Sequence, residues 1–171
     1  SQHIPHWESS YFYAMTGTIG ELRRLSEGVG TPTPFQLIGA SWLDAQLLGQ
    51  RLNALELPGV IFRPTSFKPR YGTGSGELQQ GVQIHISDYD TVDPAAISLA
   101  LMSELVSLAP QQNLFAEYEQ PDGSASGFLK ALGSRDMAQQ LAANRVPVMN
   151  AEQQARLEAY LQRRQDYLLY P

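Results

Sequence analysis

Two glutamates, Glu21 and Glu27, lie close together in the chain at the start of a segment rich in glycine and proline. Glycoside hydrolysis needs two carboxyl groups that flank the scissile bond, one of which protonates the leaving oxygen. Glu21 and Glu27 are therefore the candidate catalytic residues. Two glutamates in a loop are also typical of solvated surface charge, and residue type alone favours that alternative.

A second candidate group is the pair Gln83 and His85, which alternates with the aliphatic residues Val82, Ile84 and Ile86. Strict alternation predicts a strand whose aliphatic side chains point inward and whose polar side chains lie on the opposite face. If that face borders a cleft, both polar side chains can hydrogen-bond a sugar or an amide. The alternative is an ordinary strand with its polar residues in solvent.

Arg63 follows the apolar segment 60–62, which predicts a short strand, and is itself followed by Pro64. We expect Pro64 to end this strand, because proline cannot continue a central one. Arg63 would then lie at the carboxyl end of the strand, where open α/β sheets bind ligands. An ion pair with any of the 17 carboxylates of the chain is the alternative role for Arg63.

The segment 72–76 alternates glycine with threonine and serine, shortly after Lys68 and Arg70. It resembles a phosphate-binding loop, but such a loop must lead into the N-terminus of a helix. Here it leads into the strand predicted over 81–86. A long loop without nucleotide binding is therefore the favoured interpretation.

The remaining pattern predicts a mixed α/β fold, with about three to five strands in a small mixed sheet and a helical C-terminal third. Residues 1–20 are rich in aromatics and predict a strand or a buried connector, and residues 35–38 predict another strand. One helix is expected to begin at Ser41, where Ser41 and Asp44 resemble a capping box. Another is expected from Asp93 to Pro110. Three more helices should follow, with caps at Ser134 and Asn150, before a docked apolar tail over 167–171.

Composition limits the possible functions. The chain has 171 residues, a net charge of −5 and no cysteine, which predicts a single domain over 1–171 without disulfides. The acidic balance argues against a nucleic-acid partner, and no apolar run has the roughly 18–20 residues of a membrane span. Three scattered histidines predict no metal site, and no cofactor motif occurs. The chain opens at Ser1, so we expect a mature product or a piece of a longer precursor.

Several stretches together resemble one protein family. They include Ile4-Pro5 with Glu8, Thr16–Thr18, the segment Leu25–Asp44, Leu57–Pro64, Gly81–His85 and the ending Tyr167–Tyr170. In register over nearly the whole chain, they are similar to the C-terminal lobe of the peptidoglycan exo-β-N-acetylmuramidase (NamZ-type) family, formerly a domain of unknown function.

The resemblance implies a two-lobed glycosidase that releases terminal N-acetylmuramic acid from peptidoglycan fragments. An N-terminal Rossmann-like lobe, absent from this chain, would carry the proposed catalytic glutamate. The C-terminal lobe, which the present chain resembles, would supply one wall of the sugar cleft. Its substrate-binding residues would be Ser26, Thr31, Arg63, Gln83 and His85, beside Glu21 and Glu27. Members are typically exported and are often periplasmic or lipoproteins. The full-length protein is then expected to be an enzyme, and this chain alone to be inactive.

The sequence departs from the family pattern at the residues best suited to an anionic sugar. Val29 and Thr33 replace two arginines of the usual motif, and Leu22-Arg23-Arg24 replaces Gly-Thr-Asn after Glu21. A guanidinium group matches a carboxylate such as the lactyl group of muramic acid. The loss favours an alternative from another class, a non-catalytic carbohydrate- or partner-binding module derived from the family.

Overall fold

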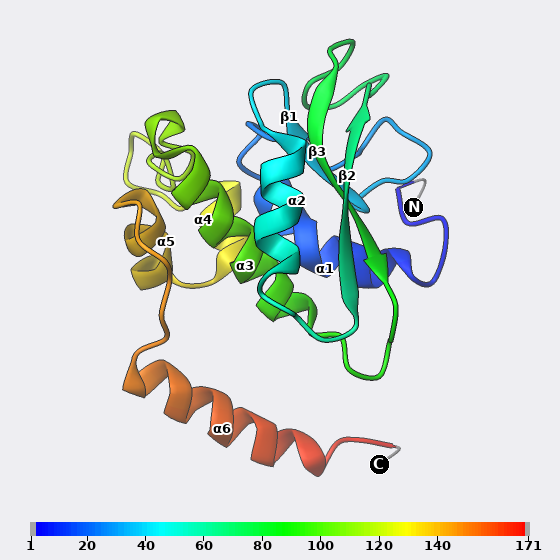
Figure 1. Ribbon diagram of the computed structural model, residues 1–171. Coiled ribbons are helices and arrows are strands. Elements are labelled where there is room, and N and C mark those ends of the chain that lie inside the picture. Colours follow the sequence, from blue (N-terminus) through cyan, green and yellow to red (C-terminus); the bar gives the residue numbers. More distant parts are fainter. Residues whose placement is uncertain (1–2, 170–171) are drawn as a thin grey trace.

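A computed structural model describes residues 3–169 of the chain (Figure 1). Its helices and strands, in chain order, are α1 (Ser9–Gly20), β1 (Leu37–Ala40), α2 (Ala45–Asn53), β2 (Val60–Phe67), β3 (Gln79–Ile86), α3 (Pro94–Leu108), the short 3₁₀ helix η1 (Pro110–Gln112), α4 (Gly127–Leu132), α5 (Arg135–Ala142) and α6 (Ala151–Gln165). The predicted α/β class and the helical C-terminal third are confirmed.

The sheet has three strands in the order β1-β3-β2, and both pairs are antiparallel. Val82 and Ile84 of β3 are buried, while Gln83 is half-buried and His85 is exposed. The alternation expected for this strand is therefore confirmed. The helix α2 packs on β2 and β3, and α1 packs on α3.

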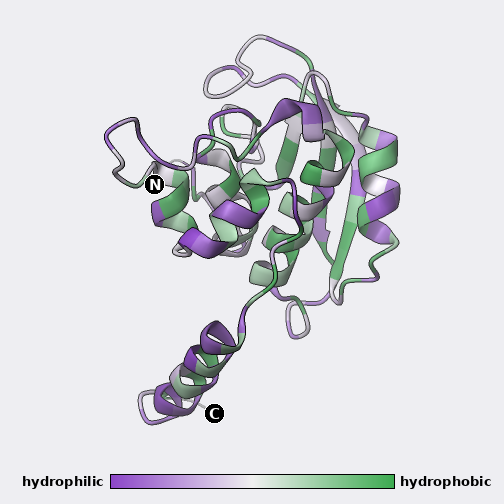
Figure 2. Ribbon diagram, turned by 90° about the vertical axis from the view of Figure 1, so that its left-hand side faces the viewer, coloured by the Kyte–Doolittle hydropathy of each residue, from purple (hydrophilic) through white to green (hydrophobic). Residues whose placement is uncertain are grey.

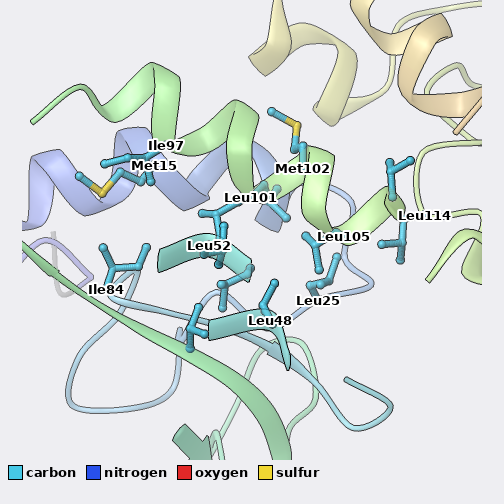
Figure 3. Packing of buried hydrophobic residues seen from close by; sticks show 14 of the residues in the cluster. Met15, Leu25, Leu48, Leu52, Ile84, Ile97, Leu101, Met102, Leu105 and Leu114 are labelled. Carbon is cyan, nitrogen blue, oxygen red and sulfur yellow. The ribbon is translucent and has the colours of Figure 1, made fainter. Parts of the chain in front are cut away.

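The hydrophobic core lies between the sheet and the helices α1, α2 and α3 (Figure 3). Leu48 and Leu52 come from α2, Ile84 from β3 and Leu101 from α3, and each is at most 1% exposed. Burying a side chain of this size stabilises the fold by roughly 1.5–3 kcal/mol. Removal of one such contact would therefore loosen the packing between the helices and the sheet.

The strand or connector expected within residues 1–20 is wrong, because residues 9–20 form the helix α1. Phe12, Met15, Thr16 and Ile19 are buried at helical spacing on one face. The Thr16 hydroxyl donates to the carbonyls of Phe12 and Phe35, at 3.1 and 2.9 Å. Burial of this face outweighs the β-propensity of the aromatic residues.

Helix starts are mostly where the sequence places them. Asp93 caps α3, Ser134 caps α5, and Asn150 caps α6 with Gln153 reaching back. The exception is α2, which begins after Asp44 rather than at Ser41. The Asp44 carboxylate accepts from the amide of Leu47 at 2.9 Å, so Asp44 is itself the N-cap.

The sequence predicts that β2 ends at Arg63, which is wrong. The strand β2 continues to Phe67. It is an edge strand, paired only with β3. The backbone N–H and C=O of Phe62 bond the Asn53 side chain, so they point to the free edge. Backbone groups alternate along a strand, so the missing N–H of Pro64 also falls on the free edge and costs no pairing.

The helix α6 projects away from the body of the molecule (Figures 1 and 2). Its first turn is joined to α5, because the Gln153 side chain donates to the Ser134 hydroxyl at 3.0 Å. No residue of α6 is buried, and Leu157, Tyr160 and Leu161 are 39%, 52% and 43% exposed. The expected docked tail is wrong for Tyr167–Leu169, all of which are exposed; Tyr170 and Pro171 lie outside the described residues. Within residues 3–169, no helix combines the length and the hydropathy of a membrane span.

Candidate functional site

A cavity of about 650 Å³ opens beside the C-terminal half of α1. Its walls come from α1, the segment 21–35 that directly follows it, the distant loop 72–74 and His3. We call it the acidic cavity, because both Glu21 and Glu27 line it, together with Tyr13, Arg23 and Val29. The two candidate catalytic residues are thus brought together.

Glu27 is the most perturbed group of the acidic cavity. Its carboxyl packs on Gly20, where an added Cβ would lie 2.9 Å from the carboxyl carbon. Its Oε2 is buried and has no hydrogen-bond partner within residues 3–169. Burial raises the pKa of Glu27 above the ordinary 4.5, and the neighbouring charge of Glu21 adds to the rise. Glu27 therefore holds its proton to a higher pH than an exposed glutamate.

Glu21 lies at the end of α1 and borders two cavities. Its Oε2 is so close to Gly127 that a Cβ there would approach it to 2.5 Å. Besides the acidic cavity, it lines an adjoining cavity of about 360 Å³. Arg23 lines both cavities as well, whereas Arg24 is paired with Glu117 at 3.0 Å.

Ser26 and Thr31 shape the segment 21–35 rather than line the acidic cavity. Ser26 is 1% exposed and bridges Gly39 of β1 through both backbone groups. Its hydroxyl oxygen is buried without a partner in the described part of the chain. The Thr31 hydroxyl donates to the carbonyl of Gly28 at 2.7 Å and accepts from the amide of Thr33, which closes the turn.

Arg63, Gln83 and His85 lie elsewhere, on the face of the sheet opposite the core. Arg63 is opposite Gln83 in the strand register, and its guanidinium donates to the Gln83 side-chain oxygen. The expected place of Arg63 at a strand end is wrong, because β2 runs on past Pro64. His85 lines a different cavity, of about 410 Å³. The seven predicted site residues therefore divide between two regions.

The glycine loop, residues 72–76, lies in the connection between β2 and β3. Its place in the acidic cavity was not predicted from the sequence. The amide of Arg70 donates to the carbonyl of Gly30 at 2.9 Å. Gly30 has φ of +90°, and an added Cβ would lie 2.2 Å from the carbonyl oxygen of Tyr71. This close approach brings Gly72–Gly74 to the acidic cavity. Tyr13 was also missed, because its place follows only from the helical spacing of α1.

The fold and the acidic cavity together define a small α/β lobe with a carboxyl-lined site in the size range of small-molecule sites. The chain belongs to the family described as exo-beta-N-acetylmuramidase NamZ, C-terminal, whose model matches residues 11–170. It is 39% identical over 111 residues to the peptidoglycan beta-N-acetylmuramidase NamZ of Bacillus subtilis (strain 168), an alignment that covers 65% of this chain and 27% of that protein.

A solved structure is also similar over the full length. The crystal structure of a DUF1343-family protein from Bacteroides fragilis NCTC 9343 matches with a TM-score of 0.83 and 34% identity. The match covers 100% of this chain and 44% of that one. The chain therefore spans less than half the length of either relative.

Proposed function

We propose that this chain is the C-terminal lobe of a peptidoglycan-processing exo-glycosidase that releases terminal N-acetylmuramic acid. The acidic cavity forms one wall of its sugar cleft. The observation that carries the proposal is the buried Glu27 carboxyl beside Glu21 in a cavity of about 650 Å³. Family membership and the activity named for the Bacillus subtilis relative support it.

In this proposal an N-terminal lobe supplies the general acid and the opposite wall of the cleft. Glu27 hydrogen-bonds a sugar hydroxyl, and the carboxylates of the cleft stabilise the oxocarbenium-like transition state. The exposed apolar side chains of α6 fit a contact with that lobe, since separated lobes expose such surface. Because peptidoglycan lies outside the cytoplasmic membrane, we also propose that the protein is exported.

Arg23 takes the place of the family arginines as the cation for a muramic acid carboxylate. Val29 lines the acidic cavity without a charge, whereas Arg23 lines it with one. Arg63 lies on the sheet face and bonds Gln83 instead. A charge-assisted hydrogen bond contributes about 1.5–3 kcal/mol, or roughly ten- to a hundredfold in affinity.

The test compares the variants Arg23→Ala, Arg63→Ala and Glu27→Gln in the full-length protein. Arg23→Ala should weaken binding of N-acetylmuramic acid by roughly ten- to a hundredfold, whereas Arg63→Ala should leave it unchanged. Release of N-acetylmuramic acid from a chromogenic muramide reports the reaction. Undiminished binding by both Arg23→Ala and Glu27→Gln would exclude the acidic cavity as the sugar site.

The second candidate is a non-catalytic carbohydrate- or partner-binding module. The uncharged Val29 side chain in the acidic cavity favours it, because the family arginine that would recognise an anionic sugar is lost there. A full-length protein that binds the sugar but releases none from the chromogenic muramide would establish this candidate and contradict the enzyme.

A further inference from the structure

We propose that a second carbohydrate-binding subsite lies at the aromatic cluster formed by Trp7, Tyr11 and Tyr89, where one pyranose ring of a neutral glycan stacks beside His85. The subsite deepens the proposed function and rests on it only for the choice of a glycan as ligand. It is formed by the N-terminus of α1, the segment that precedes it and the end of β3.

The three rings of the cluster contact one another and leave one ring open to solvent. Trp7 lies 4.9 Å from Tyr89 between ring centroids, and Tyr11 lies 5.2 Å from Tyr89. The indole of Trp7 is 63% exposed. An exposed aromatic ring held in place by two others is an apolar surface with little conformational freedom left to lose on binding.

Polar groups surround a cavity of about 410 Å³ directly beside this cluster. Tyr89 belongs both to the cluster and to the cavity wall, which also contains His6, Glu8, Gln36 and His85. Hydroxyl and acetamido groups need donors and acceptors together. Imidazole, amide, carboxylate and phenol groups provide both around one small space.

The charges of this wall favour a neutral ligand. Among residues 3–169, no lysine or arginine lines the cavity, and Glu8 supplies a negative charge. Burial, and after it the charge of Glu8, raises the pKa of Tyr89. A phosphate or carboxylate group would be repelled here, whereas a pyranose ring offers an apolar face to the indole and hydroxyls to the wall.

The subsite is distinct from the acidic cavity. The two cavities share no lining residue. His3 lines the acidic cavity and His6 lines the other, so the chain segment before α1 runs between them. A glycan long enough to occupy both would place its anionic sugar at the acidic cavity and a neutral sugar at the aromatic cluster.

The experiment uses the 171-residue chain and the β-1,4-linked trimer of N-acetylglucosamine as the probe. Trp7 and Trp42 are the two tryptophans of the chain, so the Trp42→Phe variant makes Trp7 the fluorescent reporter. We expect the trimer to shift the emission of Trp7 in a saturable manner. No change of emission at saturating trimer would overturn the proposal.

Calorimetry of three further variants locates the binding. Trp7→Ala and His85→Ala should each weaken trimer binding by roughly two- to tenfold, because one loses a stacking surface and the other a hydrogen bond. Tyr160→Ala is the matched control, since Tyr160 is an exposed aromatic residue of α6 and is not among the described residues that line either cavity. His85 is exposed, so its replacement tests the subsite without disturbing the cluster.

The outcomes separate this proposal from the proposed function. Equal affinity of Trp7→Ala, His85→Ala and the parent chain overturns the subsite and leaves the acidic cavity untouched. Binding of an isolated stem peptide in place of the trimer also overturns it. Loss of trimer binding in these variants supports the subsite. If the full-length protein also releases no N-acetylmuramic acid, the proposed enzyme is contradicted while the subsite stands.

Discussion

Folding disfavours the charged form of Glu27 relative to its protonated form, so its pKa is higher in the folded chain than in the unfolded one. Burial is the largest cause of its raised pKa, and the Glu21 charge acts in the same direction. A raised pKa in the native state means that the stability it brings is fully present at low pH. That stability is lost as the pH rises through the native pKa.

Glu27→Gln removes this titration while it keeps the shape of the side chain. We expect the free energy of unfolding of the parent chain, relative to Glu27→Gln, to fall as the pH rises above the ordinary 4.5. Urea unfolding between about pH 4 and pH 8 measures the difference. A difference that does not change with pH would show that the carboxyl is not perturbed by burial.

Asp88→Asn is the control of opposite sign. The pKa of Asp88 is lowered, first by the backbone amide of Asp90 and then by the hydroxyl of Thr91. Its contribution to stability is therefore present above the pKa of the unfolded chain and is lost as the pH falls through the native value. The two variants should change the pH profile of stability in opposite directions.

At the scale of residues, the sequence could pair Glu21 with Glu27 because they are neighbours along the chain. It could not add Tyr13 or Gly72 to them, since these reach the acidic cavity only through the fold. Arg63 was misplaced for a definite reason. The rule that proline ends a strand holds for central strands. The sequence does not show that β2 is an edge strand, nor that the missing N–H of Pro64 falls on its unpaired side.

At the scale of elements, Gly30 keeps the glycine loop against the segment 21–35. Gly30→Ala should destabilise the chain by strain at φ of +90° and by overlap with the carbonyl oxygen of Tyr71, 2.2 Å from an added Cβ. Gly76→Ala is the matched control, because its φ is +77° and its Cβ would meet nothing within 4 Å. We expect about 1–2 kcal/mol for Gly76→Ala and about 1–3 kcal/mol more for Gly30→Ala.

Denaturant unfolding of the two glycine variants checks this expectation. Equal losses would show that the loop moves away without cost and that the close approach at Gly30 does not hold it. A larger loss for Gly30→Ala, with weaker binding of N-acetylmuramic acid, would connect the loop contact to the acidic cavity.

The helix α6 should contribute little to the stability of this chain. None of its residues is buried, so a deletion of residues 158–171 is expected to change the free energy of unfolding by less than about 0.5 kcal/mol. Asp44→Ala, which removes the cap of α2, is the positive control at about 1 kcal/mol. A loss larger than that of the control would mean that α6 packs on the chain in solution.

Caps and turns were the most predictable elements, because a single side chain close in sequence defines each of them. Asp93, Ser134 and Asn150 needed no knowledge of the fold. The helix α1 was not predicted because its aromatic residues favour strand, although its five buried residues recur at helical spacing. The exposed tail after α6 was missed because an apolar sequence does not show what covers it.

At the scale of the whole molecule, we expect the 171-residue chain to have no measurable muramidase activity. It spans 27% of the Bacillus subtilis relative. In the proposed cleft the general acid that protonates the leaving oxygen comes from the N-terminal lobe, so this chain supplies one side of the glycosidic bond. The assay is the release of N-acetylmuramic acid from a chromogenic muramide, with the full-length protein as the control. Release by the chain alone would show that these 171 residues contain the complete catalytic machinery.

The order of the strands along the chain differs from their order in the sheet, and this matters during synthesis. The central strand β3 is the last of the three to leave the ribosome, so β1 and β2 exist for a time without their shared partner. Incompletely folded chains aggregate through the backbone groups of unpaired strands. The four residues of β1 offer a neighbouring chain few pairing groups. Pro64 lacks the N–H that such a chain would pair with along the free edge of β2. The proline tolerated at the sheet edge thus protects the nascent chain as well.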